Sequence, residues 1–172
     1  MAKAKVLTKD EMKRVEKIIA ADSNSTRNML AFKLSVLGGM RVGEVAALTV
    51  GQVRGLDGKA VAVINLSKEQ TKGHKARRVF LSDELQTAIT KFLATQPNVD
   101  DNAALIRSTK THKHFSPNTL CALFKSIYRK SGISTSKSFF ACSEYWSITT
   151  SSELVVSPQL SSDLFKMEPN IT

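Results

Sequence analysis

The stretch Leu37–Val50, LGGMRVGEVAALTV, places an arginine shortly after a paired glycine and an acid one helical turn further on. The glycines predict the end of a preceding helix, because glycine readily takes the left-handed conformation found at helix C-termini. The arginine is Arg41 and the acid is Glu44, and their spacing puts both on one face of a short helix predicted over 42–48. Two interpretations remain open: a solvent-exposed pair at a helix start, or a buried charged pair that grips an anion.

The residues before this stretch predict two helices. Thr8 and Glu11 have the spacing of a capping box, which starts a helix that runs to about Ala21. A second helix begins near Thr26 and ends at the paired glycine. Its inward positions are Met29, Leu30, Leu34 and Leu37.

The apolar pattern changes after residue 58. The segments 59–67 (KAVAVINLS) and 77–82 (RRVFLS) are rich in β-branched residues, and a polar stretch separates them, which predicts a β-hairpin. Ser82 can cap a helix to about Thr95, and a polar linker follows over 95–103. The predicted fold is therefore mainly α with a small antiparallel β-hairpin (α+β), without βαβ alternation.

A last amphipathic helix is predicted after Ser116 and Pro117, which make a good N-cap and first turn. Gly132 closes it. Its apolar residues recur at helical spacing: Leu120, Leu123, Phe124, Ile127 and Tyr128.

Composition indicates the class of partner. The chain has 172 residues, and its 42% of hydrophobic residues fits a globular protein. Its formal charge of +10 favours nucleic acid as the partner over an anionic membrane. We find no membrane-spanning segment and no signal peptide. The two cysteines are too few for a disulfide scaffold and lack metal-ligand spacing, so we expect no metal and a cytoplasmic location.

The charge is concentrated before residue 131. Residues 131–172 hold 2 basic and 4 acidic residues, which leaves 25 − 2 = 23 basic and 15 − 4 = 11 acidic residues for 1–130. The same C-terminal segment contains 15 serines and threonines among its 42 residues, and it has no arginine or histidine. The sequence after about residue 135 therefore differs in composition from the rest.

The predicted hairpin has a basic turn, TKGHKARRVFL. Lys72 lies at its tip, 72 − 41 = 31 residues after Arg41, and Lys75, Arg77 and Arg78 follow. A flexible ammonium group at a hairpin tip can enter a DNA groove and donate a proton to a leaving oxygen. The alternative is a solvated basic turn.

Together, GMRVGEVAAL and TKGHKARRVFL resemble the catalytic domain of the tyrosine recombinases, the phage integrase family, and the resemblance runs from about Lys5 to about Ile133. It implies an integrase-like catalytic domain that breaks and rejoins DNA through a tyrosine–phosphate bond, without metal or cofactor. The partners it implies are double-stranded DNA and other recombinase protomers, in the cytoplasm with the nucleoid.

The resemblance also implies residue roles. Arg41 would hold the scissile phosphate and Glu44 would hold Arg41 in place. Lys72 would protonate the departing oxygen, with Lys75 as its substitute if the turn register is shifted. The other predicted DNA-binding residues are His74, Arg77 and Arg78.

The resemblance weakens where the family needs a His-x-x-Arg pair and a nucleophilic tyrosine. No arginine follows Arg129, and Tyr145 is a weak candidate for the nucleophile because its neighbours differ from the family's. Tyr128 is expected to be buried. The one His-x-x-Arg match, His74 with Arg77, lies in the hairpin, where the geometry is wrong for a helical pair.

We therefore expect a partial, truncated catalytic domain over 1–135 and an atypical Ser/Thr-rich tail over 136–172, frameshifted or disordered, with strand cleavage inactive. His112 and His114, in a polar loop, are interpreted as DNA-proximal or solvated. The family's separate N-terminal DNA-clamping domain has no counterpart in these residues. Two alternatives remain: a basic, regulatory DNA-binding module without chemistry, and a helical protein with an accidental motif.

Overall fold

The computed structural model describes residues 7–71, 74–109, 111 and 113–133. Helices predominate in this part of the chain, and its single sheet is a two-stranded antiparallel hairpin, so the predicted fold class is confirmed. The elements in order are α1 (Lys9–Ala20), α2 (Ser25–Val36), α3 (Val42–Ala47), α4 (Val50–Val53), β1 (Val63–Leu66), β2 (Arg77–Phe80), α5 (Asp83–Ala94) and α6 (Pro117–Lys130).

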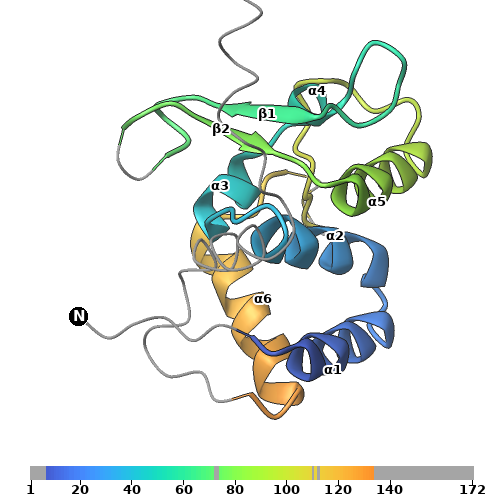
Figure 1. Cartoon of the computed structure of the whole chain (residues 1–172), viewed down its shortest axis with the longest axis vertical. Helices are drawn as coiled ribbons and strands as arrows, with labels where there is room; N and C mark the ends of the chain where they lie inside the picture. Colours follow the sequence, from blue (N-terminus) through green and yellow to red (C-terminus); the bar gives the residue numbers. More distant parts are fainter. Residues whose placement is uncertain (1–6, 72–73, 110, 112, 134–172) are drawn as a thin grey trace, which may run out of the picture.

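Helix α2 is the central element of the core. It packs against α1, α3 and α5, and α6 crosses beside α1 and α3 (Figure 1). A helix surrounded by neighbours must be apolar on most sides. This is the case for α2, whose buried side chains include Leu30, Phe32, Leu34 and Val36.

Local capping signals determine where three helices begin. Thr8 and Glu11 form the predicted capping box: the Glu11 N–H donates to the Thr8 hydroxyl at 3.2 Å, and the Thr8 N–H donates to the Glu11 carboxylate at 3.0 Å. Ser82 and Ser116 each accept a hydrogen bond from a first-turn backbone N–H of α5 and α6. The predicted starts of these helices are confirmed.

The paired glycine between α2 and α3 serves two different needs. Gly39 has φ +58, a left-handed conformation that favours glycine. Gly38 is required for space, since a Cβ there would lie 2.6 Å from the carbonyl oxygen of Leu34 and 3.3 Å from Leu85 Cδ2. The turn that leads into Arg41 therefore requires glycine at both positions, for its backbone conformation at Gly39 and for space at Gly38.

We expect Gly38→Ala to lower the free energy of unfolding by about 1–3 kcal/mol, because the added methyl group overpacks the backbone of α2. Gly43 is the matched control, since a Cβ there meets only Pro117 Cγ at 4.0 Å. Gly43→Ala should raise stability by about 0.5–1 kcal/mol, because alanine is the better helix former. Urea denaturation of both variants tests the pair, and a neutral Gly38→Ala would contradict this account of the turn.

The hairpin is shorter than predicted. We expected strands over 59–67 and 77–82, but β1 and β2 pair only from Val63↔Phe80 to Leu66↔Arg77. The Val61 N–H donates to the Val53 carbonyl at 3.0 Å, so the chain before β1 is bonded to the end of α4. The sequence did not predict α4 itself, a single turn.

The polar segment after α5 is bonded to the α3–α4 region. The Gly51 and Val50 N–H groups donate to the carbonyls of Asp101 and Ala103, at 2.8 and 2.9 Å. The Leu105 N–H donates to the carbonyl of Leu48 at 2.9 Å, which helps to explain why α3 ends before Leu48. These bonds attach the segment after α5 to the C-terminal end of α3 and to α4.

Candidate phosphate-binding site

Glu44 is the buried centre of the candidate site. Its side chain is 1% exposed, although it carries a carboxylate. The carboxylate accepts the backbone N–H of Arg41 at 2.8 Å and the Arg41 Nη1–H at 3.2 Å. Glu44 thus satisfies a free N–H at the start of α3 and holds the arginine side chain. Glu44 is therefore buried whereas half of the Arg41 side chain is exposed, so the pair is not simply a solvent-exposed one, and its grip on an anion stays a prediction.

Arg77 reaches the same carboxylate from strand β2. Its Nη2 lies 2.6 Å from Glu44 Oε2, its Nε lies 3.3 Å from Oε1, and Nη2 also donates to the Gly39 carbonyl at 3.3 Å. A fork of two N–H groups on one carboxylate is the strong, directional form of an arginine ion pair. Arg77 therefore fastens the hairpin to the N-terminal end of α3.

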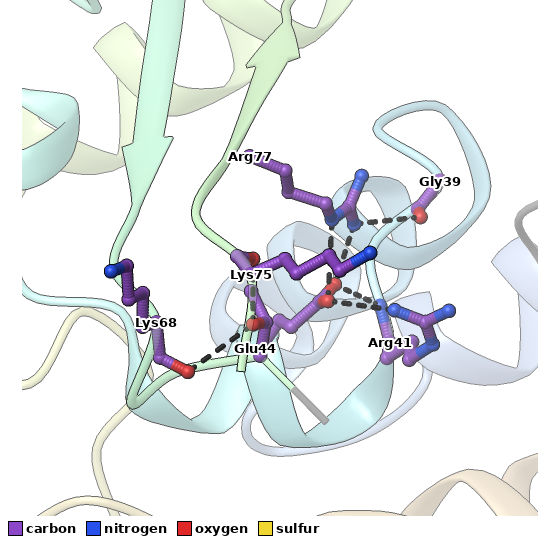
Figure 2. A network of polar contacts seen from close by, with 7 residues as sticks. Gly39, Arg41, Glu44, Lys68, Lys75 and Arg77 are labelled. Atoms are coloured by element: carbon purple, nitrogen blue, oxygen red, sulfur yellow. Dashed lines mark hydrogen bonds and ion pairs between the residues drawn. The ribbon is translucent and has the colours of Figure 1, made fainter. Parts of the chain in front are cut away.

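Arg41 is the guanidinium that remains available. Its side chain is 50% exposed, against 34% for Arg77, and only Nη1 contacts Glu44. Two guanidinium groups on one carboxylate leave a net charge of +1 at this point. Figure 2 shows the Lys75 side chain running from the hairpin toward the two arginines, which adds a further positive charge. The arrangement is suited to an anion.

Strand alternation separates Arg77 from Arg78, which the sequence analysis grouped as DNA-binding residues. Arg77 shares the inner face of the hairpin with buried Val79, whereas Arg78 is exposed on the outer face. The Arg78 guanidinium lies over the ring of exposed Phe80, 6.0 Å from its centroid. The period of two in a strand was the signal that could have separated them. DNA binding by either residue stays a prediction.

The hairpin loop is closed at its base by a buried threonine. The Thr71 hydroxyl lies 2.8 Å from the Lys75 carbonyl and 3.2 Å from the Lys68 carbonyl. His74 is exposed and has φ +50, a left-handed conformation within the turn. Lys72 lies outside the described residues, so its predicted approach to Arg41 stays a prediction.

The sequence matches the model of the phage integrase family over residues 5–142. The chain belongs to the phage integrase family. This excludes the interpretation of its motif as accidental. None of the curated proteins matches the sequence.

Solved structures similar to this phage integrase family member share its fold. The crystal structure of XerA recombinase aligns with a TM-score of 0.66 at 21% identity, over 87% of this chain and 52% of that one. The lambda integrase catalytic core aligns with a TM-score of 0.59 at 19% identity, over 84% of this chain and 81% of that one. Lambda integrase (residues 75–356) bound to DNA aligns with a TM-score of 0.60 at 20% identity, over 87% of this chain and 51% of that one. The chain thus spans about half the length of the XerA chain.

The loop before α6 places His114 of this integrase-family chain against α3. His114 Nδ1 lies 3.0 Å from the Ala46 carbonyl oxygen, close to the C-terminal end of α3. The loop is thus bonded to the helix that carries Glu44, so His114 is not merely solvated. Its proximity to DNA stays a prediction, and His112 lies outside the described residues.

A further arginine, Arg27, makes its contacts outside this site. Its guanidinium donates to Asn28 Oδ1 and to the Arg107 carbonyl, and lies 4.9 Å from the centroid of the Phe115 ring. Burial lowers the pKa of Arg27, and the nearby Asp22 charge opposes that effect. These contacts join α2 to the loop before α6.

Tyr128 is the only tyrosine among the described residues of this family member, and it belongs to the core. It is 6% exposed and its ring meets Phe32 edge-on and Phe124 at a tilt. Its expected burial is confirmed. Tyr145, the weak nucleophile candidate, lies outside the described residues, as does the tail over 136–172. Within the described ranges no cluster of acids, histidines and cysteines could hold a metal ion, and no helix is long and apolar enough to cross a membrane.

Proposed function

We propose that this chain binds a backbone phosphate of duplex DNA through Arg41 and the hairpin lysines, as the phosphate-gripping part of a tyrosine-recombinase catalytic domain. Arg41 would supply the guanidinium. Lys72 would reach the same phosphate from the hairpin tip, with Lys75 as its substitute. The reaction that such a domain serves is DNA recombination or integration, and the proposed partners of this chain are double-stranded DNA and further protomers.

The observation that carries the proposal is the burial of Glu44. Removing a carboxylate from water is costly unless charged partners and hydrogen bonds compensate for the loss. Here Arg41 and Arg77 both contact the carboxylate, although neither is itself buried. The arrangement stabilises one orientation of a half-exposed guanidinium, which is what a phosphate-binding site requires.

Similar structures support the choice of ligand. Lambda integrase is described in its structures as bound to DNA, as a dimer bound to a COC′ core site and as a tetramer bound to a Holliday junction. The Tn1549 transposon integrase is described in complex with circular intermediate DNA, with a TM-score of 0.63 at 13% identity. We extend DNA and multimeric assembly from these proteins to this chain on the basis of the shared fold and the charge at Arg41.

The chemistry we propose divides the work between three groups. Arg41 stabilises the negative charge that builds on the phosphate during attack, a contact worth about 3 kcal/mol in comparable oxyanion sites. A hairpin lysine gives a proton to the departing 5′ oxygen. A tyrosine hydroxyl attacks the phosphorus. Because the sequence has no His-x-x-Arg pair after residue 80 and neither tyrosine has the surroundings of the family's nucleophile, we propose that the chain binds DNA without cleaving it. We retain a regulatory DNA-binding module as the alternative.

The salt dependence of DNA binding tests the proposed contact with backbone phosphates. The affinity for a labelled duplex should fall steeply between about 50 and 200 mM salt, with a log–log slope of about −3 or steeper, because several phosphates lose their counterions to the protein. Fluorescence anisotropy gives the slope. Salt-insensitive or absent binding would contradict the proposed function.

The proposed absence of cleavage is tested on a nicked suicide substrate, in which cleavage would trap a covalent protein–DNA adduct. We expect binding without an adduct under denaturing electrophoresis. An adduct would show that the chain cleaves DNA, and its loss in Tyr145→Phe would identify Tyr145 as the nucleophile. The cytoplasmic, nucleoid-associated location stays a prediction.

A further inference from the structure

Two glutamines form a reciprocal amide pair between α4 and the hairpin loop. Gln52 Nε2 donates to Gln70 Oε1 at 2.8 Å, and Gln70 Nε2 donates to Gln52 Oε1 at 3.0 Å. Gln52 belongs to α4, and Gln70 lies in the loop between β1 and β2. The pair therefore joins the loop that carries the lysines to the helical part of the domain.

The remaining hydrogen-bonding capacity of both amides goes to the backbone. Gln70 Nε2 also donates to the Ala47 carbonyl at 3.0 Å, and Gln52 Nε2 donates to the Asn65 carbonyl at 3.2 Å. The two Oε1 atoms accept the N–H groups of Ser67 and Thr49, each at 3.1 Å. A fully satisfied amide pair has one preferred geometry, because any rotation leaves a donor or acceptor without its partner.

The bond to Ala47 gives the hairpin a second attachment to α3. Ala47 is the last residue of that helix, whereas Arg77 is attached to Glu44 near its start. A hairpin held at one point can pivot about it, and a second contact at the other end of the helix prevents this. The orientation of the loop relative to Arg41 is therefore determined by Arg77 and Gln70 together.

We propose that Gln70, paired with Gln52, is a positioning residue that fixes the hairpin loop around Thr71 and Lys75 relative to Arg41. The connection to Lys75 is short. Thr71 follows Gln70 directly, and its buried hydroxyl contacts the Lys75 carbonyl. The effect on DNA binding rests on the function proposed above, whereas the anchoring of the loop does not.

Amide hydrogen exchange without DNA tests the anchoring. The amides of Thr71 and His74 bond to the carbonyls of Lys68 and Thr71, so they report on the loop and not on the side chain that is replaced. In Gln70→Leu their exchange should be about tenfold faster or more, because the loop opens locally, while amides of the β1–β2 ladder keep their rates. Unchanged exchange at both amides would overturn the proposal.

Gln86→Leu is the matched control. Gln86 is also a half-buried glutamine, and its Nε2 donates to the Leu81 carbonyl at 2.9 Å, but it lies on α5. This variant should leave the exchange of the loop amides unchanged. If Gln70→Leu does not fold, the isosteric Gln70→Glu replaces it, since the carboxylate still accepts hydrogen bonds but no longer donates to Ala47.

A double-mutant cycle tests the link to DNA. Lys75→Ala should weaken duplex binding about three- to tenfold in wild type and in Gln86→Leu. In Gln70→Leu the loss should be less than about twofold, because Lys75 is already displaced. A full lysine effect in Gln70→Leu would overturn the positioning role. If the wild type itself does not bind DNA, the proposed function fails, and the exchange experiment still decides whether Gln70 anchors the loop.

Discussion

Replacing Glu44 with glutamine should lower the free energy of unfolding by about 2–4 kcal/mol, because it removes the charge on which two guanidinium groups converge. The amide that replaces the carboxylate presents N–H groups to Arg41 or Arg77, which have only donors to offer. We place the effect below that of a fully buried ion pair because both arginines retain contact with water. Chemical denaturation followed by circular dichroism measures it.

The control for this prediction is Glu84→Gln. Glu84 also forms an ion pair, at 2.7 Å with Lys33, but its side chain is 62% exposed against 1% for Glu44. Surface pairs of this kind contribute about 0–1 kcal/mol. Similar losses in the two variants would show that burial does not strengthen the Glu44 contacts and would remove the main support for an organised phosphate site.

Replacing Arg41 with alanine should weaken duplex binding by about 10- to 100-fold, the equivalent of one charge-assisted hydrogen-bonded contact to phosphate. The salt dependence should become shallower by about one unit of log–log slope, because one fewer phosphate is neutralised. Anisotropy titrations at several salt concentrations give both quantities. The fold should survive the change, since Arg41 is half exposed and Glu44 retains Arg77.

The matched control is Arg14→Ala, which removes the same charge from an exposed position on α1. Helix α1 packs on α2 and α6 and lies away from the hairpin (Figure 1). We expect less than about a twofold loss of affinity, because a distant charge contributes only through the screened field of the whole protein. Equal losses for Arg14 and Arg41 would mean that DNA responds to total charge and not to a site.

Much of the fold could be read from local sequence. The starts of α1, α5 and α6 follow from Thr8, Ser82 and Ser116, because a capping side chain and the N–H groups it satisfies are neighbours in the chain. The hairpin followed from its β-branched residues, although its length did not. Pairing with the end of α4 shortened β1, and that contact has no local signal.

The sequence predicted which residues belong to the candidate site, but not how they contact one another. The spacing of Arg41 and Glu44 indicated a contact, yet the same spacing fits a surface pair and a buried one. Arg77 was predicted as a DNA contact together with Arg78. Because a pleated strand alternates its faces, the two adjacent arginines point in opposite directions, and only Arg77 reaches Glu44.

The sequence by itself determined the starts of α1, α5 and α6, the hairpin and the positive charge at its turn, since each depends on residues close together in the chain. The tertiary structure alone decided that Glu44 is buried, that Arg77 binds it across 33 residues, and that Gln52 and Gln70 pair across 18. The physical reason is that the cost of burying a charge or an amide is set by the surrounding groups. Those groups come together only when the hairpin packs against α3.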